Sequence, residues 1–193
     1  MMKKAAVLGL CTTCASALTA AEPLRLDSRF DASAVQWVTQ AGDSQVTGTA
    51  FLTLADGSRR SCAGFKVELL PVAEYSNERI RLTYGNNQQG QILLEQHPPK
   101  FTPDDPAYHE LLLKSQCDAQ GVFDFRQVPA GEFYVMVFVI WEEAGADPTP
   151  GQPERLSGPA RPRHQRGGAL MKRIRVEPAA RLEVTLGDPA SAR

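Results

Sequence analysis

Short segments in which apolar and polar side chains alternate recur along most of this chain. Between positions 46 and 54, Ala50 and Leu52 fall on one face of an extended chain, while Thr49 and Thr53 fall on the other. The segments 65–70 and 182–186 show the same period of two. This pattern predicts β-strands that have one buried face and one exposed face.

One segment, 133–141, is apolar on both faces. Val135 and Val137 alternate with Met136 and Phe138. A strand of this kind lies in the centre of a sheet, or another segment covers its second face. With a further strand expected at 170–176, the pattern predicts an all-β fold, an antiparallel sandwich.

Two segments interrupt the strand pattern. The first, 73–115, is too long for a hairpin loop and is expected to be an insertion that carries function. Within it, Asp105 is expected to cap a short helix that starts at Pro106. The second interruption, 145–168, is rich in proline and predicts a surface loop.

Turn signals separate the expected strands of the segment 117–141. Asp118 and Gly121 occupy the first and fourth positions of one turn, where those residue types are favoured. Pro129 and Gly131 belong to the next turn, in which proline fixes the backbone angle φ.

This block resembles the carboxypeptidase regulatory-like domains, which are transthyretin-like β-sandwiches. Their recurring pattern is Thr-Asp-x-x-Gly-x-Phe-x-Phe, followed by Leu-Pro-x-Gly-x-Tyr. Here the positions 117–125 and 128–133 fit it, with Cys117, Val128 and Phe133 standing where the family has Thr, Leu and Tyr. The resemblance implies a seven- or eight-stranded sandwich in which the turn residues are architectural. It also implies a non-catalytic accessory role on an exported or surface protein.

The first residues predict export. Lys3 and Lys4 precede an uncharged stretch, and small residues follow it just before Glu22. This order is typical of a signal peptide, here 1–21, and leaves a single domain at 22–193 in the periplasm or outside the cell. A lipoprotein anchored through Cys11 is disfavoured, because a small residue precedes a lipidated cysteine and Leu10 is large.

Beyond the leader, the chain contains the cysteines Cys62 and Cys117. In an exported protein such a pair predicts a disulfide, and the alternative is two buried thiols. The 193 residues have a net charge of -1, so the protein as a whole has no positive electrostatic field that would attract nucleic acid.

The candidate binding surface combines residues from both interruptions. Tyr108 and His109 lie in the insertion, Trp141 precedes the proline-rich loop, and Arg161 and Arg163 lie within it. The arginines could meet a polysaccharide or an acidic partner, or could simply keep a loop and an edge strand soluble. Trp141 could be a platform for sugar stacking or an anchor in the core.

An enzymatic role rests on weaker signals. Tyr84, His97, Tyr108 and His109 are of the right types for ferric iron, but a close His-x-His spacing is missing. The side chains of adjacent Tyr108 and His109 are expected to diverge and to be solvated. We therefore expect no catalytic residues, no metal and no cofactor.

The sequence as a whole favours an exported, non-catalytic binding or assembly module of the cell envelope. The expected partner is an envelope protein or a polysaccharide that the sequence does not identify, and not nucleic acid. The alternatives are a carbohydrate-binding module and a metal-dependent enzyme.

Overall fold

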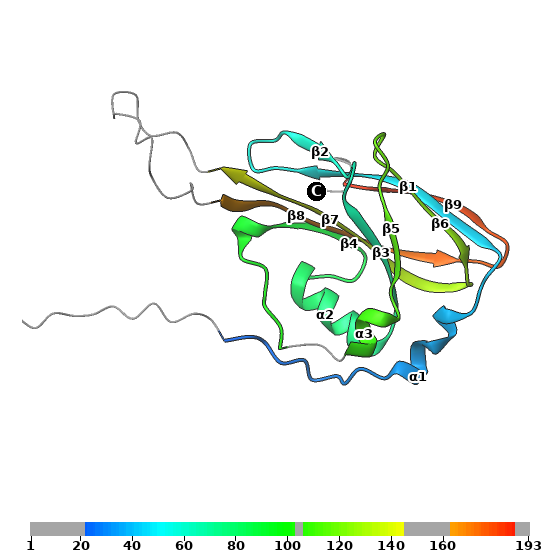
Figure 1. Cartoon of the computed structure of the whole chain (residues 1–193). Helices are drawn as coiled ribbons and strands as arrows, with labels where there is room; N and C mark the ends of the chain where they lie inside the picture. The colour runs from blue at the N-terminus through cyan, green and yellow to red at the C-terminus, as the bar shows by residue number, and fades with distance from the viewer. Residues whose placement is uncertain (1–21, 103–105, 145–162, 188–193) are drawn as a thin grey trace, which may run out of the picture.

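The alternating segments of the sequence form strands in two β-sheets that face each other (Figure 1). The computed structural model describes residues 22–102, 106–144 and 163–187. The expected signal peptide, Asp105 and most of the proline-rich loop lie outside these residues. The prediction of an all-β sandwich is confirmed.

The smaller sheet has four strands, in which β1 pairs with all the others. Its strands are β1 (Ser44–Thr53), β2 (Arg59–Ser61), β6 (Val122–Val128) and β9 (Arg181–Leu186). β2 and β6 run antiparallel to β1, whereas β9 runs parallel to it. The expectation of a wholly antiparallel sandwich is therefore wrong at this one pair, because β9 reaches the smaller sheet from β8 of the other sheet.

The larger sheet has five strands, all antiparallel to their neighbours, in the order β4-β8-β7-β3-β5. Their bounds are β3 (Lys66–Pro71), β4 (Gln89–Leu93), β5 (Leu113–Gln116), β7 (Gly131–Ala144) and β8 (Arg163–Val176). β8 therefore lies inside the sheet, and the edges are β4 and β5. β4 pairs with residues 168–172 of β8, so this part of the strand is not an edge.

The segment 73–115 is only partly an insertion, because it supplies both of these edge strands. It also holds α2 (Glu74–Tyr84), which precedes β4. The 3-10 turn η2 (Leu94–Gln96) and α3 (Pro106–Glu110) lie between β4 and β5. The expected helix start at Pro106 is confirmed. These additions raise the described strands to nine, one more than the sequence predicted.

Local contacts define the ends of α2. The backbone N–H of Ala73 donates to Oγ of Ser76 at 2.8 Å, just before the first helical turn. At the other end Gly85 adopts a φ of 73°, and its N–H donates to the Arg81 carbonyl. A left-handed residue of this kind ends a helix, and glycine adopts it without a steric penalty.

The side chains of β7 fill two separate hydrophobic layers. Phe133, Val135 and Val137 point into the core between the sheets and are fully buried. Tyr134 and Met136 point to the opposite face, where α2, α3 and the N-terminal segment around Phe30 lie against the sheet. The prediction that this strand is central and covered on its second face is confirmed.

Two short helices precede β1 in the described chain, α1 (Ala32–Val35) and the 3-10 helix η1 (Gln36–Thr39). They bring Trp37 edge-on to Phe133, with ring centroids 5.2 Å apart. A Cβ atom at Gly131 would lie 2.3 Å from the Trp37 ring, so the close approach of this ring requires glycine. Gly131 thus has a packing role besides its place in the turn.

The turn at Asp118 is held by its own side chain. Oδ1 of Asp118 accepts from the N–H groups of Gln120 and Val122, both at 2.9 Å. The N–H of Gly121 donates to the Asp118 carbonyl, and Gly121 has a φ of 80°. The predicted turn, with Asp118 first and Gly121 fourth, is therefore present.

The predicted disulfide between Cys62 and Cys117 is confirmed. Cys62 follows β2 of the smaller sheet and Cys117 follows β5 of the larger one, so the bond joins the two layers. Both residues are buried in the sandwich core. Within the described ranges no helix is long and apolar enough to cross a membrane.

Loss of this bond is expected to lower the free energy of unfolding of C62A/C117A by about 4 kcal/mol, because the bond closes a loop of 55 residues. Urea denaturation of the oxidised wild type and the double variant measures the difference. Reduced wild type serves as a control and should lose a similar amount. A double variant as stable as the oxidised wild type would contradict the expectation.

Candidate functional site

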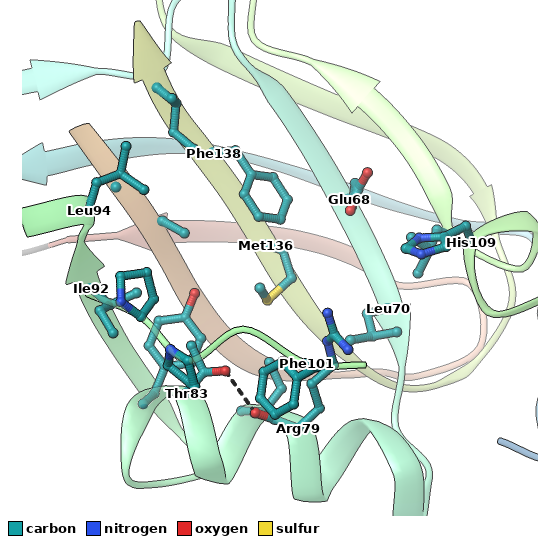
Figure 2. Close-up of a pocket in the computed structure, with 18 of the residues that line it drawn as sticks. Glu68, Leu70, Arg79, Thr83, Ile92, Leu94, Phe101, His109, Met136 and Phe138 are labelled. Atoms are coloured by element: carbon teal, nitrogen blue, oxygen red, sulfur yellow. Dashed lines mark hydrogen bonds between the residues drawn. The ribbon is translucent and has the colours of Figure 1, made fainter. Parts of the chain in front are cut away.

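A cavity of about 270 Å³ lies between α2 and the outer face of the five-stranded sheet (Figure 2). Its walls come from α2, α3, β4 and the segment 94–101, and its floor comes from β3, β7 and β8. The site therefore depends on the segment 73–115, which supplies every wall element.

The floor of the cavity is apolar. Met136, Phe138 and Ile140 occupy alternate positions of β7, and Ala169 of β8 and Ile92 of β4 continue the surface. These residues are adjacent in the sheet register, since Phe138 and Ile92 both pair with Ala169. Sites for small ligands are typically built in this way, from apolar side chains with a few polar groups.

The cavity is also lined by polar and charged side chains. Figure 2 shows Glu68 of β3 and His109 of α3 together on the side opposite Ile92 and Leu94. Arg79 of α2 also lines the cavity. A ligand in this space would meet apolar atoms over most of its surface and a small number of polar groups.

Aromatic rings hold Arg79 in place. Its guanidinium carbon lies 4.5 Å from the ring centroid of Phe101 and 5.6 Å from that of Tyr108. The hydroxyl of Thr83, one helical turn away, donates to the Arg79 carbonyl at 2.9 Å, the contact that is dashed in Figure 2. Cation–π contacts of this kind fix a long side chain that would otherwise sample many rotamers.

Tyr84 is a half-buried cavity residue with an unusual hydroxyl. Among the described residues, its hydroxyl oxygen is buried and has no hydrogen-bond partner. Burial raises the pKa of Tyr84 well above that of an exposed tyrosine, so the group is neutral near pH 7. The hydroxyl of the nearby Tyr134 instead donates to Oδ1 of Asn77 at 2.5 Å.

The structure brings Tyr108 and His109 together in the cavity wall. Tyr108 is 6 % exposed, and its ring centroid lies 5.2 Å from that of His109. The expectation that the two side chains diverge is therefore wrong, and Tyr108 is buried, whereas His109 is exposed as expected. The short α3 packs against Tyr75 and Phe30, whose rings contact Tyr108 edge-on, and this aromatic cluster buries Tyr108.

The other predicted surface residues lie away from the cavity. Trp141 packs against the sandwich core, and the guanidinium carbon of Arg60 lies 4.0 Å from its ring centroid. Arg163 begins β8 and pairs with Glu142 at 3.1 Å, so its segment is a strand and not the predicted loop. Arg161 lies outside the described residues.

Three of the four residues considered for iron meet at the cavity, namely Tyr84, Tyr108 and His109. His97 is not among the residues that line it. In the part of the chain that the structure describes, no group of three or more His, Cys, Asp and Glu side chains is placed to hold a metal.

Comparisons with known proteins add a fold relationship. No family model matches the chain, and no curated protein matches its sequence. The crystal structure of a Pseudomonas aeruginosa protein, described as a candidate carbohydrate-binding protein, is similar in fold, with a TM-score of 0.59. The two share a fold. They are 21% identical, over 81% of this chain and 96% of that protein, so the likeness concerns architecture alone.

Sequence reasoning found part of the cavity and missed the rest. It named Tyr108 and His109, and it weighed Tyr84 only as an iron ligand. It did not identify α2, because the buried positions Tyr75 and Ile80 are five residues apart and do not show a clear helical repeat. The glycine at position 85 was the available signal for the end of a helix.

The free energy of unfolding of the variant Tyr84→Phe is expected to be about 1 kcal/mol higher than that of the wild type, because the variant lacks a buried hydroxyl that has no partner. The matched variant Tyr134→Phe should be about 1 kcal/mol less stable, because it leaves the Asn77 carbonyl without its donor. Urea denaturation near pH 7 compares the two. A loss of stability in Tyr84→Phe equal to that in Tyr134→Phe would refute the assignment.

Alkaline pH provides a second measurement on the same variant. Since the pKa of Tyr84 is raised in the folded protein, the unfolded chain loses this proton first, and the wild type is expected to lose stability as the pH rises above about 10. The loss should be less steep in Tyr84→Phe. Equal slopes of unfolding free energy between about pH 9 and about pH 11 would show that Tyr84 is not buried in this way.

Proposed function

We propose that this chain is a non-catalytic binding module that works outside the cytoplasm and holds a small ligand in the cavity beneath α2. The observation that carries the proposal is the cavity itself, with its apolar floor and a few polar side chains in its walls. A space of about 270 Å³ exceeds the roughly 150 Å³ of an apolar cavity that accommodates benzene.

The disulfide supports a location outside the cytoplasm. Disulfides form and persist in oxidising compartments, and the one here joins two buried cysteines. The signal-peptide pattern at the start of the sequence is consistent with the same location. We propose the periplasm or the extracellular space.

Membership of the carboxypeptidase regulatory-like domains is part of the proposal. In support of it, the motif residues Asp118 and Gly121 form a turn, and Phe123 and Phe125 are buried in the sandwich core. These roles are architectural, as the resemblance implied. They leave binding to the segments that lie outside the motif.

A carbohydrate is the second candidate ligand. It is favoured by the description of the structural neighbour as a candidate carbohydrate-binding protein and by the aromatic side chains of the cavity. Trp141 supports it less than the sequence suggested, because Arg60 stacks on its ring. An array of glycans probed with the purified protein tests this candidate directly.

Filling the cavity is expected to abolish binding. Ala169→Phe places a ring over the cavity floor, and Thr83→Phe fills the space from the side of α2, in case the first variant does not fold. The measurement is saturation-transfer NMR with a panel of neutral one- and two-ring compounds. Wild type should bind members of the panel, and both variants should lose at least tenfold in affinity, because their added rings occupy the ligand volume.

Ala119→Phe is the matched control, because it adds the same ring at an exposed turn position outside the cavity. It should bind as the wild type does. If the wild type binds neither the panel nor any glycan, the proposed function is wrong. If Ala169→Phe and Thr83→Phe fold and bind as well as the wild type, the ligand site lies elsewhere.

A further inference from the structure

The hydroxyl of Tyr84 is the feature of the cavity that the fold does not explain. Tyr84 is the last residue of α2, and its oxygen is buried with no partner in the described parts of the chain. Buried polar groups in native proteins are nearly always hydrogen-bonded, so an exception calls for a specific reason. Phenylalanine would fill almost the same volume without a buried hydroxyl.

The ring of Tyr84 is fixed by two glycines. Gly85 ends α2 directly after it, with a φ of 73°. On β4, a Cβ atom at Gly90 would lie 3.2 Å from Cδ1 of Tyr84, so the ring packs closely on the strand backbone. The phenol is therefore held in one position against the sheet. A fixed position favours a role that requires a defined geometry.

The chemistry of the group defines what it can recognise. Because burial raises the pKa of Tyr84, its hydroxyl keeps its proton and can act as a hydrogen-bond donor at neutral pH. The surrounding floor of Met136, Phe138 and Ile140 is apolar. An ionised ligand group would lose its hydration there, so a neutral acceptor fits this environment better.

We propose that the Tyr84 hydroxyl donates a hydrogen bond to the ligand, and that the cavity selects small neutral ring compounds that carry a carbonyl or ether oxygen. This inference rests on the proposed function, because it takes the cavity as the ligand site. The hydroxyl oxygen is enclosed in the free protein, so a ligand that accepts this hydrogen bond must displace the atoms that cover it. A free sugar fits less well, because its several hydroxyl groups would need several partners on a floor that is apolar.

Two probes of matched shape test the donor. Acetophenone carries a carbonyl oxygen, and isopropenylbenzene has a methylene group in its place. Their affinities are measured by NMR titration for the full processed protein, for Tyr84→Phe and for the control Tyr134→Phe, whose hydroxyl pairs with Asn77 and which does not line the cavity. Comparing probes and variants together isolates the one interaction.

The expected result is that Tyr84→Phe weakens acetophenone binding about fivefold, as the loss of one hydrogen bond requires, and leaves isopropenylbenzene binding unchanged or stronger. Tyr134→Phe should bind both probes as the wild type does. The carbonyl carbon of ¹³C-labelled acetophenone should shift downfield on binding to the wild type and less on binding to Tyr84→Phe. This shift reports the hydrogen bond itself.

Other outcomes overturn the inference in distinguishable ways. If both probes bind and Tyr84→Phe changes neither or weakens both equally, the cavity binds ligands without using the hydroxyl, so the inference fails and the proposed function stands. If the protein binds a glycan and neither probe, the inferred ligand class is wrong although a binding role stands. If nothing binds, the proposed function and this inference fail together.

Discussion

The structure depends on one strand that is apolar on both faces. β7 buries Phe133, Val135 and Val137 in the sandwich core, and on its other side it buries Tyr134, which is 0 % exposed. A strand of this composition cannot have one face in water without exposing a continuous apolar surface. The fold therefore needs a third layer, and the segment 73–115 supplies it with α2, α3 and the chain around them.

The cavity follows from how incompletely that layer covers the sheet. α2 has 11 residues and packs closely where Tyr75 and Ile80 meet Leu70 and Tyr134. Farther along β7, at Phe138 and Ile140, the same covering segment leaves a space of about 270 Å³. A single short helix cannot cover a five-stranded sheet with the density of a core, so the space lies between the helix and the sheet.

The two sides of the larger sheet thus differ in what covers them and in the side chains that they carry. The inner side is closed by the smaller sheet and by the disulfide between Cys62 and Cys117, which joins the layers near β2 and β5. The outer side carries the polar groups of Glu68, Arg79 and His109 and the unpaired hydroxyl of Tyr84. The sandwich core thus lies on the inner face, and the proposed ligand site lies on the outer face.

The sequence by itself determined the features that depend on neighbours along the chain. Alternation at Ala50 and Leu52 identified β1, and the two apolar faces of 133–141 identified a covered central strand. Asp118 and Gly121 identified a turn, because their preference for it is local. The cysteine count limited the disulfide to one pair once a leader was assumed.

Only the tertiary structure decided the features that depend on contacts between distant segments. It placed β9 parallel to β1, assigned the edges of the larger sheet to β4 and β5, and buried Tyr108 among rings from α2 and the N-terminal segment. It also gathered Glu68, Tyr84 and His109 at one cavity, although they lie far apart in the sequence. Periodicity reports which face of an element is buried but not which partner buries it, so a site built by six separate segments has no local signature.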